Sequence, residues 1–221
     1  MKTALTILLL FFSTILLGQN KYWSFGLKKN GICFGNSSYF NGLRFNFIDE
    51  NVIKYNGINL SLATNSQLTN GVSFGLLSST HELFNGFNIS GIFSSGNYNG
   101  ILVTGLWSMT SKINGISISG INTGDTLNGL ILGYWTVYGD KEINGVALGT
   151  FYVHSKKMNG LSFALLKNEF SIQKGLSISF FNDSKELHGV QLGLLNHAEN
   201  NRRMFRWSPF INFNLRKNAT K

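Results

Sequence analysis

An Asn-Gly dipeptide recurs about every 15 residues through most of this chain, and it constrains the fold more than any other feature. Self-similarity at a fixed step indicates one supersecondary unit copied along the chain. The sequence therefore predicts a repeat protein whose fold follows from how the copies pair or stack. The eight clear copies are Asn56-Gly57, Asn70-Gly71, Asn85-Gly86, Asn99-Gly100, Asn114-Gly115, Asn128-Gly129, Asn144-Gly145 and Asn159-Gly160.

Each Asn-Gly opens a segment in which large apolar residues alternate with small ones. Residues 72–76 read Val-Ser-Phe-Gly-Leu and residues 116–119 read Ile-Ser-Ile-Ser, while Lys174-Gly175 and His188-Gly189 open two diverged copies. A period of two is typical of β-strands, and Asn-Gly supplies the positive φ angles that a tight turn or corner needs. An all-β fold follows, with large side chains on one face of each strand and Ser, Asn, Ala or Gly on the other.

A second pattern doubles the repeat. The small residue near the end of each strand is Ser61, Ser90, Ser119, Gly149 and Ser179 in alternate copies, but Gly75, Thr104, Gly133, Ala164 and Gly193 in the copies between. Shorter and longer steps also alternate in the first copies, as from Asn56 to Asn70 and from Asn70 to Asn85. These patterns predict a unit of about 29–30 residues that contains two strands.

Three architectures accommodate such a unit. We expect first a closed antiparallel up-and-down β-barrel of outer-membrane type, with a lumen lined by small residues. The alternative is a β-solenoid in which each coil contains the whole double repeat and has two sides, and an open two-sheet meander is the third. Aromatic residues near strand ends favour the barrel, as does the alternating segment 209–215, which is typical of a closing strand. Those aromatic residues are Phe84, Tyr98, Trp107, Tyr134, Trp135, Phe151, Tyr152, Phe180 and Phe181.

The first residues read as a secretory signal. Lys2 precedes an apolar run over 4–17 that is too short to span a bilayer comfortably and ends at the small residue Gly18. We predict a signal peptide over 1–18, a single all-β repeat domain over 19–221, and an exported protein of the outer membrane or cell surface of a Gram-negative-type bacterium. Cys33 is the lone cysteine, which excludes an internal disulfide framework.

The net charge of +9 is concentrated near the C-terminus, in Arg202, Arg203, Arg206, Arg216, Lys217 and Lys221. For an exported protein this basic end indicates anionic lipid headgroups or polysaccharide as partners, and not nucleic acid. The expected partners are therefore the outer membrane or an envelope glycan, and protein partners stay open.

The sequence contains no convincing catalytic, cofactor or metal site. The histidines His81, His154, His188 and His197 lack metal-ligand spacing, and the one acid–base pair within reach is His197 with Glu199. Trp107 and Trp135 have rings of the kind that stack on sugars, but rim or core packing is the favoured interpretation for each. Acidic residues in the predicted turns would form a ladder in a solenoid, too sparse for the calcium-binding repeats: Asp125, Asp140, Glu142, Asp183 and Glu186.

Residues 114–122, residues 188–196, the following Ala198-Glu199-Asn200-Asn201 and the segment 209–213 carry a family resemblance. Over roughly residues 40–215 the chain is similar to exported surface-repeat proteins of Bacteroidetes and Leptospira. The resemblance implies an envelope location and brings no catalytic or binding residues. The expected function is a structural or interaction role without catalysis. The alternatives are an outer-membrane solute channel lined by Ser61, Ser119 and Asn88, and a β-solenoid that binds envelope glycan or lipid.

Overall fold

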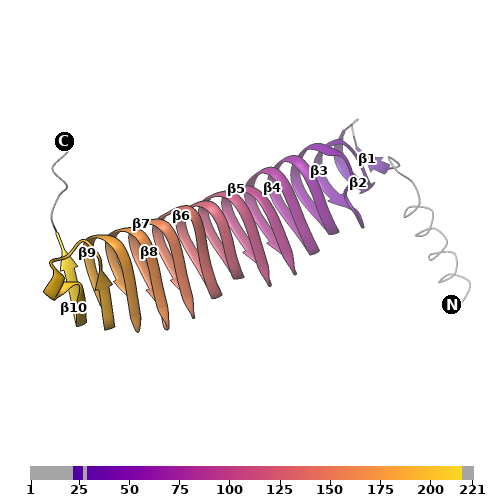
Figure 1. Cartoon of the computed structure of the whole chain (residues 1–221). Helices are drawn as coiled ribbons and strands as arrows, with labels where there is room; N and C mark the ends of the chain where they lie inside the picture. Colours follow the sequence, from indigo (N-terminus) through magenta and orange to yellow (C-terminus); the bar gives the residue numbers. More distant parts are fainter. Residues whose placement is uncertain (1–21, 27–28, 216–221) are drawn as a thin grey trace, which may run out of the picture. The chain divides into compact units, whose positions relative to one another are not determined.

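The computed structural model describes residues 22–26 and 29–215. Its contacts cluster in two compact units, an N-terminal unit of residues 1–97 and a C-terminal unit of residues 98–221, and each is described by itself (Figure 1). The predicted signal peptide over 1–18 lies outside the described residues, and the single domain over 19–221 stays a prediction.

The N-terminal unit begins with a short antiparallel pair and continues as parallel coils. Tyr22 of β1 pairs with Gly35 of β2, whereas β2, β3 and β4 pair in parallel in chain order. The strands that lie in this unit are β1 (Tyr22–Phe25), β2 (Asn30–Gly35), β3 (Tyr39–Phe45) and β4 (Val52–Ser90), and β5 (Phe93–Thr104) begins here.

The C-terminal unit is built of parallel coils of the same kind and then reverses direction. Strands β6, β7, β8 and β9 pair in parallel, and the last strand pairs antiparallel with β9 after the 3-10 helix η1 (Arg203–Phe205). Strand β10 therefore covers the open edge of the last coil (Figure 1). Its elements after β5 are β6 (Trp107–Gly149), β7 (Tyr152–Ala164), β8 (Lys167–Ile178), β9 (Phe181–Ala198) and β10 (Trp207–Asn214).

Parallel pairing makes this fold a β-solenoid. The all-β prediction is confirmed, and the solenoid alternative is confirmed over the antiparallel barrel that we expected first, which is wrong. The coil length is also corrected. Gly145 pairs with Gly160, which pairs with Gly175, so one coil spans a single Asn-Gly repeat and not the predicted double repeat.

The Asn-Gly dipeptides are not hairpin turns, because the strands run through them. Instead the asparagine side chains stack and hydrogen-bond to one another in each unit. Asn70 Nδ2 donates to Asn56 Oδ1 at 2.8 Å in the N-terminal unit, and Asn144 Nδ2 donates to Asn128 Oδ1 at 2.8 Å in the C-terminal unit. The asparagine ladders comprise Asn30, Asn41, Asn56, Asn70 and Asn85, and Asn99, Asn114, Asn128, Asn144 and Asn159. Asn30 and Asn41 are further copies, which the predicted repeat did not include.

The glycine of each dipeptide is needed for close stacking. Gly145 has a φ of +123°, and a Cβ on it would lie 2.3 Å from the carbonyl oxygen of Gly129 one coil earlier. Such a φ is rare for residues with a side chain, and the overlap with backbone oxygen adds to the strain. Asn and Gly therefore act together at one corner of the coil.

The alternation of small residues marks two kinds of second corner. Ser119 closes its corner by donating from Oγ to the carbonyl of Ile121 at 2.7 Å. At Gly133 a Cβ would lie 2.4 Å from the Thr136 carbonyl oxygen, so this corner leaves no room for a side chain at residue 133. What read as a two-strand unit is therefore a variation between successive coils.

Small residues fill one side of the coil interior and larger ones the other. In the C-terminal unit Ser162 and Ser177 are fully buried and stack in register, and Met158 before the corner is also fully buried. A third interior row carries amides, since Asn182 Nδ2 donates to Asn196 Oδ1 at 2.8 Å. The alternating large residues after each Asn-Gly consequently face outward. The barrel interpretation also predicted large residues on the outside and small residues on the inside. In the structure, however, the small residues belong to a packed core and not to a lumen.

Two further expectations attached to the barrel are corrected. The aromatic residues do not form two rims, because Phe84 and Tyr98 are buried in the interior whereas Trp135, Phe151 and Phe180 are exposed outside. Residues 209–215 do not close a barrel, because β10 pairs with β9 alone in the described sheet order.

A buried ion pair closes the interior of the first coils. Arg44 Nη2 lies 2.6 Å from Asp49 Oδ2, and both side chains are 1% exposed. Asn59 binds both partners, accepting from Arg44 Nε at 3.0 Å and donating to Asp49 Oδ2 at 2.7 Å. Burial raises the pKa of the neighbouring Cys33 thiol to about 11, so this thiol stays protonated and packs as a small apolar group.

Candidate functional site

The outward face of the C-terminal unit carries a stripe of large apolar side chains at the second corner of most of its coils. Each member is at least 42% exposed, and Tyr134 reaches 63%. Monomeric soluble proteins rarely expose contiguous apolar patches of more than a few hundred Å². We call these residues the apolar stripe: Leu106, Tyr134, Trp135, Phe151, Leu165, Leu166, Phe180, Leu194 and Leu195.

Backbone hydrogen bonds show that the stripe is aligned from coil to coil. The Phe180 amide donates to the Leu165 carbonyl at 3.0 Å, and the Leu195 amide donates to the Phe180 carbonyl at 3.0 Å. The parallel register therefore places one or two large apolar side chains per coil beside those of the next coil.

A groove of about 410 Å³ runs along the C-terminal end of the stripe. Its walls include Phe163, Leu165, Phe180 and Leu194, and Phe210 of β10 also lines it. Phe210 is 69% exposed and has a φ of +64°, an uncommon value for a bulky residue. The bulge between Ser208 and Phe210 thus extends the apolar surface onto β10.

The N-terminal unit has a smaller counterpart. Leu76, Leu77 and Ile92 are exposed at the equivalent corner, and the Ile92 amide donates to the Leu77 carbonyl at 2.9 Å. A groove of about 420 Å³ lies beside Leu76 and is lined also by Phe47, Leu62 and Phe74.

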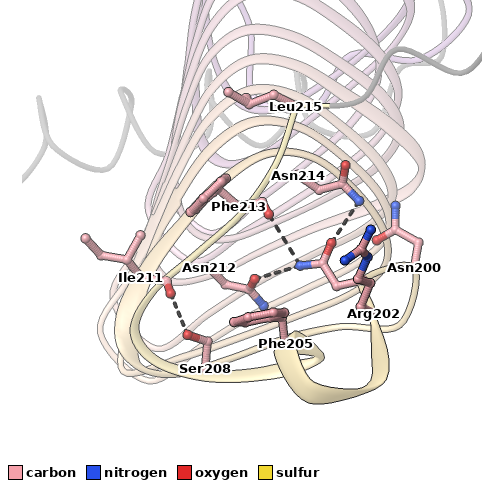
Figure 2. A pocket seen from close by; sticks show the side chains of 10 residues that line it. Asn200, Arg202, Phe205, Ser208, Ile211, Asn212, Phe213, Asn214 and Leu215 are labelled. Carbon is pink, nitrogen blue, oxygen red and sulfur yellow. Dashed lines mark hydrogen bonds between the residues drawn. The ribbon is translucent and has the colours of Figure 1, made fainter.

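The C-terminal end of the second unit contains a pocket of about 540 Å³ between η1 and β10 (Figure 2). Asn201 is one of its lining residues, and it donates to Asn212 Oδ1 at 2.7 Å and accepts from Asn214 Nδ2 at 2.8 Å. Figure 2 shows Asn212 and Asn214 on the same side of β10 as Arg202, whereas Ile211, Phe213 and Leu215 point to the opposite side. The pocket is lined by Asn200, Asn201, Arg202, Phe205, Ser208, Ile211, Asn212, Phe213, Asn214 and Leu215.

The opposite outward face of the C-terminal unit is polar, and it holds the predicted His197. This residue does not pair with Glu199. Its Nδ1 lies 2.8 Å from Asp183 Oδ1 on the preceding coil, and its ring stacks on Trp207 with centroids 4.2 Å apart. The parallel register places Asp183, 14 positions earlier in the chain, beside His197. The prediction from sequence proximity, Glu199, was therefore wrong.

A second polar group lies on the same face, one coil earlier. Tyr152 Oη and Lys167 Nζ each donate to Glu169 Oε2 at 2.6 Å, and these two hydrogen bonds lower the pKa of Glu169. His154 stacks between Tyr138 and Tyr152, and partial burial lowers its pKa. These side chains hold one another in place.

The other predicted ionisable residues serve separate local contacts. His81 is buried in the N-terminal unit with Nδ1 2.6 Å from Ser66 Oγ, and desolvation lowers its pKa to about 3. Asp125 pairs with Lys141 at 2.9 Å, Glu142 with Lys157 at 3.7 Å, and Glu186 with His188 at 3.7 Å. Across residues 22–26 and 29–215, no three His, Cys, Asp or Glu side chains group in a way that could hold a metal ion.

The remaining sequence candidates are distributed through the fold. Ser119 and Asn88 are buried in the interior and Ser61 is half-buried, so they do not line a lumen. Trp135 belongs to the apolar stripe, and Trp107 donates from Nε1 to Thr123 Oγ1 at 3.0 Å. Sequence reasoning did not identify the stripe as a site, although the run of large residues after each strand was the signal for it.

Within the described part of the chain, no helix combines the length and the apolarity required to cross a bilayer. Comparison with protein-family models, with curated proteins and with solved structures finds no match to this chain.

Proposed function

We propose that this chain is an exported, non-catalytic envelope protein that attaches to a membrane surface through its apolar stripe. The stripe is the observation that supports the proposal, because its nine large apolar side chains remain in contact with water unless a partner covers them. Burying apolar surface is favourable by about 25 cal/mol per Å², so a partner that covers the stripe gains substantially.

Two features favour a lipid surface over other occupants. The stripe contains Tyr134 and Trp135, residue types that settle at membrane interfaces because one end of the ring is apolar and the other polar. Arg202, Arg203 and Arg206 are exposed at the end of the same unit, and the chain carries a net charge of +9. Anionic headgroups attract such basic residues by about 1 kcal/mol each near the surface.

The alternatives are weaker. A solute channel depends on an open lumen, and the interior row around Ser162 and Ser177 is fully buried. A catalytic role lacks support because the best-placed ionisable groups are engaged in structural pairs, as Asp183 is with His197. The resemblance to surface-repeat proteins and the predicted export agree with an envelope location, and both stay predictions.

Co-sedimentation with vesicles tests the proposal. We expect the protein to pellet with vesicles of phosphatidylglycerol and phosphatidylcholine, and the double variant Leu166→Ser/Phe180→Ser to stay in solution. Met109→Ser is the matched control, since Met109 is 55% exposed outside the stripe. Failure of the unaltered protein to bind any vesicle, or equal binding by the stripe variant, would sink the proposal. A concentration-dependent dimer that the stripe variant abolishes would assign the stripe to a second copy instead.

A further inference from the structure

The pocket between η1 and β10 combines a charged group with apolar walls. Arg202 lies on the side of β10 that Asn212 and Asn214 face, and Phe205 lies near them, whereas Phe213 and Leu215 add apolar surface on the opposite side of the strand (Figure 2). A ligand that fits both parts carries an anionic group and a hydrocarbon portion.

The asparagine amides of the pocket already make hydrogen bonds within the protein, so its charged donor is the arginine. Asn200 donates to the Leu187 carbonyl at 3.0 Å and accepts from the Leu187 amide at 3.0 Å. Asn201 and Asn214 bind each other at 2.8 Å. Among the described residues, no carboxylate forms an ion pair with Arg202, Arg203 or Arg206. The asparagines therefore set the shape of the pocket, and the guanidinium groups retain their charge for a ligand.

We infer that this pocket binds the phosphate group of an anionic phospholipid. A guanidinium presents paired N–H donors that match two phosphate oxygens, which makes arginine the preferred residue for this contact. The inference rests on the proposed attachment to a membrane and names the lipid chemistry that the attachment selects.

The apolar walls argue for a lipid rather than free phosphate. Phe205 is 61% exposed, Phe213 64% and Leu215 73%. Phe210, on the same strand as Phe213, lines the groove of the apolar stripe. A phospholipid seated with its phosphate at Arg202 would place its acyl chains along surface that continues toward the stripe.

Vesicle binding of the full chain tests the inference, with Arg202→Gln/Arg203→Gln as the pocket variant. The matched control is Lys156→Gln/Lys185→Gln, which removes the same charge from exposed positions that do not line the pocket. We expect the pocket variant to bind phosphatidylglycerol vesicles at least about tenfold more weakly and the control to stay within about twofold of the unaltered protein. On pure phosphatidylcholine vesicles all three should bind alike. Equal weakening by the pocket variant and the control would overturn the inference.

A second measurement separates the pocket from the stripe. Isothermal titration with a short-chain phosphatidylglycerol below its micelle concentration needs no bilayer. Saturable binding that the pocket variant loses and Leu166→Ser/Phe180→Ser retains supports the pocket, even if the chain fails to bind vesicles and the proposed function falls. Absence of binding, or binding of inorganic phosphate with equal affinity, overturns the lipid assignment.

Discussion

The side-chain amide of Asn144 donates a hydrogen bond of 2.8 Å to Asn128, sixteen positions earlier in the chain and one coil away. The same asparagine accepts from Asn159 on the following coil. A residue that sequence alone assigns to a turn is thus part of a ladder that sets the register of the coils.

Removing this amide should destabilise the solenoid. Asn144→Ala breaks two side-chain hydrogen bonds, each worth about 1 kcal/mol, so we expect a loss of roughly 1–2 kcal/mol in the free energy of unfolding measured with urea. Lys174→Ala is the control at the equivalent repeat position, where the chain has no amide, and should change stability by less than about 0.5 kcal/mol. Equal effects at both positions would mean that the ladder contributes no specific stability.

The corner glycine should tolerate no side chain. Gly145→Ala places a Cβ against the Gly129 carbonyl oxygen and imposes a φ of +123° on alanine. The backbone conformation alone costs roughly 1–3 kcal/mol, and the overlap adds to it. Gly139→Ala is the comparison, because its φ is not in the left-handed region and its closest neighbours are side-chain atoms of Ile143 and Ser155. Thermal unfolding should show a much larger decrease for Gly145→Ala, and the reverse order would contradict this account.

The Arg44–Asp49 pair should behave as a buried ion pair. Arg44→Ala leaves the Asp49 carboxylate unpaired at 1% exposure, so we expect a loss of about 3–5 kcal/mol in the free energy of unfolding. Lys141→Ala breaks an exposed pair whose side chains are 67% and 41% exposed, and should leave the urea midpoint nearly unchanged. If both variants unfold at the same urea concentration, burial does not determine the contribution of the first pair.

The interior serines should be replaceable by alanine but not by larger residues. Ser162 Oγ is buried without a hydrogen-bond partner, so Ser162→Ala should be neutral or stabilising by up to about 1 kcal/mol. Ser162→Leu inserts side-chain volume between Ala147 and Ser177 and should destabilise by about 1–3 kcal/mol or more. Urea titration of both variants checks the order, and a stable leucine variant would indicate a loosely packed interior.

His81 should make stability depend on pH. Burial lowers its pKa to about 3, whereas in the unfolded chain the imidazole titrates near its ordinary pKa of 6.5. The unfolded state therefore binds more protons between these values, and the His81 contribution is complete above the unfolded pKa and falls as the pH decreases. Between about pH 7.5 and about pH 4.5 the unaltered protein should lose roughly 2–3 kcal/mol relative to His81→Gln. An unchanged difference between the two proteins over this range would show that His81 is not kept neutral by folding.

Local patterns in the sequence predicted the strands well. The alternation of Val72, Ser73 and Phe74 depends only on which side of a strand each side chain occupies, and the structure keeps that alternation. The Asn-Gly repeat likewise located one corner of nearly every coil. These features are local, so a single copy suffices to recognise them.

Pairing and partner choice were not predictable in the same way. Successive strands with two-residue alternation can fold back as antiparallel neighbours or advance as parallel coils, and both place the same residues on the same face of each strand. His197 was assigned to Glu199 by proximity in sequence, but the coil register brings Asp183 to it. The apolar stripe was not predicted for a related reason. Which large residues lie side by side depends on the coil length, and the coil length comes from the structure.

The sequence by itself therefore determined an all-β repeat, the period of its corners and the two faces of its strands, since these follow from residue size, alternation and backbone preference. The tertiary structure decided that one repeat makes one coil, that the small residues face the core, and that large apolar side chains collect in an exposed stripe. These outcomes depend on hydrogen bonds between successive coils, as between Asn144 and Asn159, and on the close approach of glycine backbones in neighbouring coils. Neither the hydrogen bonds between coils nor the close approach of glycine backbones can be predicted from the pattern of polar and apolar residues in a single copy.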